Sequence, residues 1–148
     1  LGMQVEIANR PGGEPQAGRR DLDELLPPLD VLSLHCPLTD PTRNLVSASR
    51  LARMKPDAVL INTARGALVD GSALAAALRA GRLGGAGIDV LEREPPPAGH
   101  PLLDPSIPNL VVTPHVAWAA REARQRCLDE LASNVAAFLA GERRNRVI

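Results

Sequence analysis

The segment DAVLINTA, at residues 57–64, is almost continuously apolar and ends at Arg65-Gly66. Strands with one solvated face alternate apolar and polar residues, whereas a strand covered on both faces is apolar throughout. The segment therefore predicts a buried strand of the kind found in parallel sheets, where helices connect the strands and cover the sheet. An arginine directly after such a strand places a positive charge at the edge of the core.

Short apolar segments alternate with helix-like segments along the chain. Strands are expected at residues 3–9, 30–37, 57–64, 85–91 and 109–115, and helices at residues 21–26, 47–54, 71–80 and 121–140. Asp21, Ser47 and Asp70 are suited to cap the first three helices, and Gly81 follows the third. The alternation implies right-handed crossovers, so it predicts a doubly wound α/β fold with a mostly parallel sheet.

The last expected helix carries an apolar stripe. Cys127, Leu131, Val135 and Phe138 follow one another at helical spacing on one face. Such a stripe is typical of a helix that packs against a core, so we expect these four side chains to be buried.

Composition limits the kind of partner. The chain has 148 residues, of which 45% are hydrophobic, and this suffices for one domain with a core. Its 17 basic and 17 acidic residues are interspersed and give a formal net charge of zero, which argues against nucleic acid and anionic membranes as partners. No apolar segment approaches the roughly 20 residues that span a bilayer. Cys36 and Cys127 lack metal-ligand spacing, so we interpret them as reduced thiols of a cytoplasmic protein.

Polar side chains follow the expected strands at their carboxyl ends, where ligands bind in parallel sheets. They are Asn9 and Arg10, then His35, Cys36 and Pro37, then Thr63, Ala64 and Arg65, then Asp89 with Glu94 beyond it, and finally His115. Each has an ordinary structural explanation when taken alone, such as a surface ion pair or a packed histidine. A cation, a carboxylate and an imidazole at one sheet edge can together hold a carboxylate and move a proton. The combination therefore predicts reduction of a 2-oxo acid, with Arg65 binding the substrate and a His115–Glu94 pair supplying the proton.

Four stretches carry a resemblance to a known family. They are LHCPLTDPTRNLV, MKPDAVLINTARGALVDGSAL, LGGAGIDVLEREP and NLVVTPHVAWAAREAR, in this order. The chain closely resembles the D-isomer-specific 2-hydroxyacid dehydrogenases, which have a Rossmann-type cofactor domain. The stretch HVAWAAREAR, with Trp118, is similar to the glycerate dehydrogenase/hydroxypyruvate reductase group. Formate dehydrogenases are similar but carry Gln in place of Glu94, which argues against them. Phosphoglycerate dehydrogenases often continue into a regulatory domain, whereas this sequence ends at GERRNRVI, which argues against that group as well.

The resemblance implies a role for each site residue. Arg65 is expected to bind substrate, His115 to act as acid/base, Glu94 to support it, and Asp89 to meet the nicotinamide carboxamide. Further contacts to NAD or NADP are implied for His35, Cys36, Pro37, Thr42, Thr63, Ala64 and Ala117, together with Arg65 and His115. Hydroxypyruvate and glyoxylate are the implied substrates, and a homodimer is the usual assembly of relatives.

The end of the first expected strand bears on cofactor choice. NAD-dependent relatives place an acidic residue there for the ribose 2′-hydroxyl, whereas this chain has Asn9 followed by Arg10. A missing carboxylate removes repulsion of a 2′-phosphate, and Arg10 can pair with that phosphate. The pair therefore predicts a preference for NADPH, unless both residues simply occupy an exposed turn.

The GxGxxG fingerprint of the family should lie before residues 8–12, and this sequence does not contain it. The sequence GGAG at residues 84–87 leads into a strand and is no substitute. We therefore expect a fragment of a full dehydrogenase, inactive alone. Residues 1–120 would form a partial dinucleotide-binding domain that lacks its first strand, and residues 121–148 a helix and tail that return to a substrate domain. The alternative is a non-catalytic module that senses dinucleotides.

Overall fold

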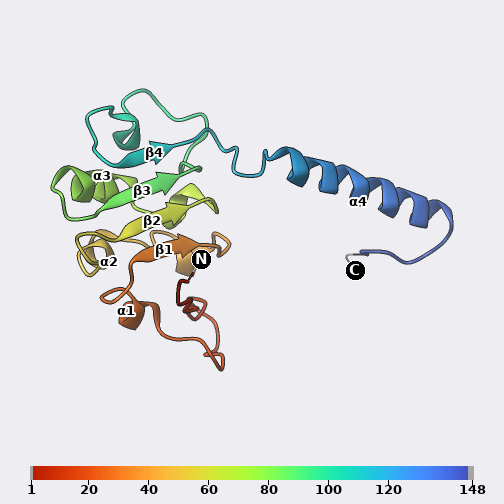
Figure 1. Ribbon diagram of the computed structural model, residues 1–148, viewed down its shortest axis with the longest axis horizontal. Coiled ribbons are helices and arrows are strands. Elements are labelled where there is room, and N and C mark those ends of the chain that lie inside the picture. Colours follow the sequence, from red (N-terminus) through yellow and green to blue (C-terminus); the bar gives the residue numbers. More distant parts are fainter. Residues whose placement is uncertain (1, 147–148) are drawn as a thin grey trace. The chain divides into compact units, whose positions relative to one another are not determined.

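The computed structural model describes residues 2–146, and the chain divides into two compact units, Leu1–His115 and Val116–Ile148. The first unit contains all the strands and the second contains one long helix (Figure 1). The sheet that is expected to position the site therefore lies in the first unit.

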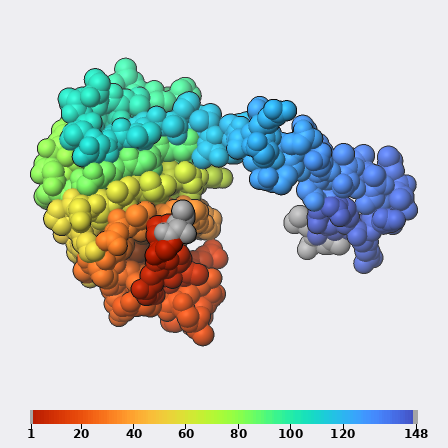
Figure 2. Space-filling view, in the orientation of Figure 1, coloured from red at the N-terminus to blue at the C-terminus, as the bar shows by residue number. Residues whose placement is uncertain are grey.

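The sheet has four parallel strands in the order β1-β2-β3-β4. Their bounds are Val31–Leu34 for β1, Val59–Asn62 for β2, Gly85–Ile88 for β3 and Leu110–Val112 for β4. The space-filling view shows the same progression, because the surface of the first unit changes colour band by band in sequence order (Figure 2). Leu34, Asn62, Ile88 and Val112 lie in register at the carboxyl ends. The residues that follow these four therefore emerge at one edge of the sheet.

One face of this sheet is covered. Helices α2 and α3 contact each other, and the strand residues that alternate toward the core are buried, as Leu60 and Ile88 show. On the opposite face, Val31 and Val111 are 50% and 64% exposed. The expected parallel α/β sheet is confirmed. A doubly wound sheet has helices on both faces, and within residues 2–146 one of the two faces is covered.

The short helices begin where the capping residues predicted. The helices are α1 at Leu22–Leu25, α2 at Ala48–Leu51 and α3 at Gly71–Arg79, with 3-10 turns at Asp40–Thr42, Gly66–Leu68 and Pro101–Leu103. Asp21 accepts a hydrogen bond from the backbone N of Asp23 at 2.7 Å, and Asp70 accepts one from Ala73 at 2.9 Å. Ser47 likewise caps α2. These bonds satisfy backbone donors that a helix leaves without intrahelical partners.

The expected strand at residues 3–9 is wrong. This segment makes only an isolated parallel bridge, between Ala8 and Arg20, and Val5 and Ile7 are 79% and 54% exposed. Its alternating sequence is typical of a strand, but a strand forms only where a neighbour takes its backbone hydrogen bonds. Among residues 2–146, no strand lies beside residues 3–7 to do so.

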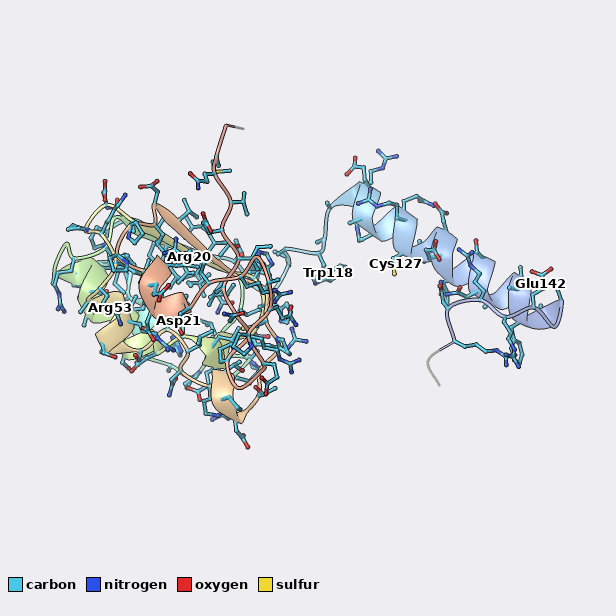
Figure 3. The ribbon with its side chains drawn as sticks, turned by 90° about the horizontal axis from the view of Figure 1, so that it is seen from below. Arg20, Asp21, Arg53, Trp118, Cys127 and Glu142 are labelled. Carbon is cyan, nitrogen blue, oxygen red and sulfur yellow. The ribbon has the colours of Figure 1, made fainter. Side chains whose placement is uncertain are left out.

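Helix α4 spans Arg121–Leu139, as its periodicity predicted, but its apolar stripe is not buried. Leu131 is 58% and Phe138 74% exposed, and the side chain of Cys127 lies on the surface of the helix (Figure 3). The expected burial is wrong because the described residues of the second unit contain no other helix or strand to cover the stripe.

Helix α4 is also too polar to cross a bilayer, and none of the helices described within residues 2–146 combines the length and hydrophobicity that a crossing requires.

Candidate active site

The carboxyl ends of β1 and β2 border an open hollow. Its lining comes from His35, Cys36, Pro37 and Leu38 after β1 and from Thr63, Ala64 and Arg65 after β2. Adjacent parallel strands bring these two loops together, although they are separated by a helix in the sequence. The structure thus gathers six of the residues expected to contact a cofactor, and the hollow is a suitable place for an elongated ligand.

Thr42 does not line this hollow but supports one of the loops that do. Its side chain is fully buried, its hydroxyl donates to the carbonyl of Pro37 at 2.8 Å, and it accepts from the backbone N of Thr39 at 2.7 Å. Thr42 therefore holds the loop after β1, and the side chain that was expected to contact a cofactor is not exposed in the hollow.

Arg65 extends from the turn after β2. Its side chain is exposed, and its guanidinium donates to the carbonyl of Ala64 at 2.6 Å. The turn beneath it is shaped by buried Asn62, whose amide bonds to the backbone of Ala64 and Arg65. The guanidinium of Arg65 is therefore a positive charge held at the edge of the hollow by its own turn.

Gly66 lies against the loop that leads to Glu94. A Cβ atom at this position would lie 2.0 Å from the carbonyl carbon of Leu91 and 2.3 Å from the backbone N of Glu92. Because both atoms belong to the backbone, no side-chain rotation relieves the clash. Glycine is therefore required at this position, and the contact ties the Arg65 turn to the Glu94 loop.

Gly66→Ala is expected to lower the free energy of unfolding by about 1 to 3 kcal/mol, because overpacking forces the backbone to shift. Urea denaturation of this chain would measure the change. Gly71→Ala is the matched control, since a Cβ there meets only side-chain atoms, the nearest 3.5 Å away. Equal stability of the two variants would contradict this account.

His115 and Glu94 form a hydrogen-bonded pair. Nδ1 of His115 lies 2.7 Å from Oε2 of Glu94, and Oε1 of Glu94 accepts from the backbone N of Leu91 at 2.8 Å. The bond to His115, followed by that to Leu91, lowers the pKa of the Glu94 carboxyl, so this group is ionised near neutral pH. The side chains of His115 and Glu94 remain 46% and 37% exposed, which leaves the pair accessible to a small ligand. Such a pair can hold a proton and deliver it from the other ring nitrogen, Nε2.

The backbone of His115 adopts a left-handed conformation with φ of 56°, which is uncommon for residues other than glycine. Its N–H donates to the carbonyl of Asp89 at 2.8 Å, and the Asp89 carboxylate accepts from the hydroxyl of Thr113. Asp89 is only 4% exposed. The end of β3 thereby fixes the position of the histidine that follows β4.

Asn9 and Arg10 have different environments. The side-chain oxygen of Asn9 accepts from the backbone N of Gln16 at 3.0 Å and closes the loop between them. Arg10 is exposed. Burial raises the pKa of the Cys36 thiol, and the positive charge of Arg10 opposes this only weakly. Asn9 therefore supports the loop that carries Arg10, and the Arg10 side chain is exposed.

Ala117 belongs to the second compact unit, whereas the other expected cofactor residues belong to the first. Within residues 2–146, no three His, Cys, Asp or Glu side chains are grouped so that they could hold a metal ion.

Sequence reasoning missed Asn62 and Thr113. Asn62 could have been found, because it is the one polar side chain in an otherwise apolar β2. A buried amide is unfavourable unless it forms hydrogen bonds, so its presence there indicates specific partners. Thr113 gave no comparable signal, since threonine is common in strands and at their ends.

Comparison with known proteins agrees with this geometry. Residues 1–117 match the family model described as D-isomer specific 2-hydroxyacid dehydrogenase, NAD binding domain. A glycerate dehydrogenase of Methylorubrum extorquens is 53% identical over 133 residues, which cover 90% of this chain and 42% of that protein. A glyoxylate reductase of Thermofilum pendens is 49% identical over 122 residues, which cover 82% of this chain and 35% of that protein.

Solved structures lead to the same family. The crystal structure of D-lactate dehydrogenase with NAD+ from Lactobacillus jensenii matches with a TM-score of 0.79 and 34% identity, covering 88% of this chain and 42% of that one. The chain therefore spans less than half the length of each of these proteins. The family match covers the sheet, the Arg65 turn and the His115–Glu94 pair, and the chain belongs to the D-isomer-specific 2-hydroxyacid dehydrogenases, matching their NAD-binding domain.

Proposed function

We propose that this chain is part of an oxidoreductase that uses NADPH or NADH to reduce a small 2-oxo acid to a D-2-hydroxy acid. The substrates proposed are hydroxypyruvate, which gives D-glycerate, and glyoxylate, which gives glycolate. The observation that carries the proposal is the 2.7 Å bond between His115 and Glu94, on the sheet edge where Arg65 also emerges. The names of the two relatives, glycerate dehydrogenase and glyoxylate reductase, support the substrate class.

Each side chain has a defined task in this reaction. A nicotinamide cofactor held in the hollow would supply the hydride for the carbonyl carbon of the substrate. Arg65 binds the substrate carboxylate through its guanidinium fork and stabilises the developing negative charge on the carbonyl oxygen. His115 donates a proton to that oxygen, so that the carbonyl gains a hydride and a proton and becomes a hydroxyl group. The Glu94 carboxylate orients the imidazole and stabilises its protonated form.

The described residues fit a dinucleotide in this role. The loops after β1 and β2 line an open hollow at the carboxyl edge of a parallel sheet, the position at which dinucleotides bind in this type of fold. The hollow presents backbone and small side chains, such as those of Pro37, Thr63 and Ala64. Asp89 lies at the end of the next strand, where its carboxylate is held by Thr113.

We further propose that residues 1–120 are the carboxyl-terminal part of a cofactor domain, and that residues 121–148 return to a substrate domain elsewhere in a longer protein. The chain corresponds to 42% and 35% of the two curated relatives. It also exposes apolar surfaces that a longer protein could cover, on one sheet face, on residues 3–7 and on α4. The phosphate-binding loop and the residues that grip the distal end of the substrate would lie in the remaining part.

The test compares this chain with a version extended upstream through its native reading frame. NADPH oxidation would be followed by ultraviolet absorbance, with hydroxypyruvate as substrate. Activity of the extended protein alone is the expected result. Activity of neither protein would contradict the reductase proposal, and dinucleotide binding without turnover would favour a non-catalytic sensing module. Activity of the short chain would contradict the proposal that it is incomplete.

Cofactor preference gives a separate prediction for the extended protein. We expect kcat/KM to be higher with NADPH than with NADH by about 10-fold or more, because a hydrogen bond to a charged group contributes roughly 1.5 to 3 kcal/mol. Asn9→Asp keeps the oxygen that accepts from Gln16 but adds a negative charge, so it should shift preference toward NADH. Arg10→Ala should lower kcat/KM for NADPH more than for NADH. Arg82 is an exposed arginine before the amino end of β3, whereas the hollow lies at the carboxyl ends of the strands, so Arg82→Ala should change kcat/KM for neither cofactor. Equal kcat/KM for the two cofactors in the unmodified protein would contradict the prediction.

We also propose that the whole protein is a cytoplasmic homodimer. Both cysteines are free thiols, which is typical of proteins in reducing compartments. Light scattering of the extended protein would measure the assembly, and a monomeric mass would contradict it.

A further inference from the structure

Asn62 occupies an unusual place in β2. It is the last residue of the strand, its side chain is fully buried, and the strand residues before it are apolar. Its Nδ2 donates to the carbonyl of Arg65 at 2.9 Å, and its Oδ1 accepts from the backbone N of Ala64 at 3.1 Å. The nitrogen and the oxygen of one buried amide are therefore bonded to the backbone of Arg65, which binds the substrate, and of Ala64, which precedes it.

These bonds act on the backbone of the turn and not on the guanidinium itself. A buried side-chain amide that loses its hydrogen-bond partners is strongly disfavoured, so the turn adopts the conformation in which the Asn62 amide reaches both backbone groups. An apolar side chain of similar size would fill the space but would leave the carbonyl of Arg65 and the N–H of Ala64 without these partners. The Asn62 side chain thus sets the backbone conformation of the turn, and with it the direction in which the chain carries Arg65 away from the sheet.

The same residue is linked to the acid/base pair. The carbonyl of Asn62 accepts from the backbone N of Asp89 at 2.9 Å, and the carbonyl of Asp89 accepts from the backbone N of His115 at 2.8 Å. A continuous series of hydrogen bonds therefore runs from Arg65 through Asn62 and Asp89 to His115. A displacement of Asn62 would change the spacing between the cation and the imidazole.

We propose that Asn62 is a positioning residue for the reductase reaction, which fixes Arg65 relative to His115 through its buried amide. This inference rests on the proposed function, since the benefit of a fixed Arg65 is to hold a 2-oxo acid. Rigid placement matters because a displacement of about 1 Å at a reacting centre can reduce a rate by about 100-fold.

The test is a double-mutant cycle in the extended protein with Asn62→Leu and Arg65→Ala. Asn62→Leu should lower kcat/KM for hydroxypyruvate by about 10- to 100-fold, with both a raised KM and a lowered kcat, because Arg65 binds and polarises the substrate. The Kd for NADPH should rise by a smaller factor than kcat/KM falls, because Asn62 also holds Ala64, which lines the hollow proposed for the cofactor. In the Arg65→Ala background, Asn62→Leu should cause no further loss, because the side chain through which it acts is gone. An equal fold-loss in both backgrounds would overturn the proposal.

A second measurement reads the turn without activity. Hydrogen exchange of the Ala64 amide should accelerate in Asn62→Leu, whereas the amide of Val59, at the start of β2, should keep its protection. Unchanged exchange at Ala64 would overturn the proposal, even if Asn62→Leu had lost activity. An inactive extended parent would instead contradict the proposed function, and the exchange data would still decide whether Asn62 orders the turn.

Discussion

Replacement of His115 by Gln in the extended protein should lower kcat for hydroxypyruvate reduction by about 10²- to 10⁴-fold. Glutamine can form hydrogen bonds at this position, but it cannot transfer a proton at neutral pH. The developing alkoxide would then have to take its proton from water. Steady-state kinetics at saturating NADPH would measure the loss, with little change in the Kd for NADPH.

His100→Gln provides the matched control for this substitution. His100 lies in the loop before Pro101–Leu103, and its Nδ1 accepts from the backbone N of Leu102 at 3.2 Å. This bond caps the local turn at Pro101–Leu103, so kcat should be unchanged. Glu94→Gln should give a smaller loss than His115→Gln, because the imidazole remains but lacks its carboxylate partner. A His115→Gln variant as active as His100→Gln would remove His115 from the mechanism.

Arg65→Ala is the second substitution with a large expected effect. Loss of one fixed donor to a developing oxyanion reduces kcat by about 10²- to 10³-fold, and loss of the carboxylate anchor adds a rise in KM. The combined decrease in kcat/KM should therefore exceed that from either contribution alone. Arg65→Lys should recover only part of the activity, because an ammonium keeps the charge but not the planar fork.

Arg79→Ala controls for the general loss of an arginine. Arg79 is the last residue of α3 and pairs with Asp104 at 2.6 Å, so its charge serves a surface contact. Its removal should leave kcat/KM unchanged. If Arg65→Ala instead lowered kcat with an unaltered KM, the anchoring role of Arg65 would be contradicted.

The parts of the fold that were predictable from sequence have local causes. The cap at Asp70 and the glycine at Gly81 determine where α3 begins and ends, and the helix forms between them as expected. The segment at residues 3–9 had an equally clear strand pattern, yet it forms no strand. A cap is satisfied within one turn of helix, whereas a strand depends on a partner that sequence pattern does not identify.

The site shows the same difference between local and distant causes. His115 and Glu94 are 21 positions apart, but each follows a strand that was expected to be parallel. Because parallel strands end at the same edge of a sheet, the sequence was enough to bring the two residues to one edge. Two features depended on neighbours that a sequence pattern does not identify. One is the pair of bonds that Asn62 makes to the turn, and the other is the left-handed backbone of His115.

The most direct measurement follows the hydrogen that the reaction transfers. The extended protein would be incubated with hydroxypyruvate and NADPH that carries deuterium at the reactive position of the nicotinamide, and the product would be analysed by mass spectrometry and chiral chromatography. Our account predicts D-glycerate with deuterium on the carbon that bears the new hydroxyl group, and almost none from the Arg65→Ala and His115→Gln variants. Product without deuterium, or no product from the unmodified protein, would contradict hydride transfer at this site.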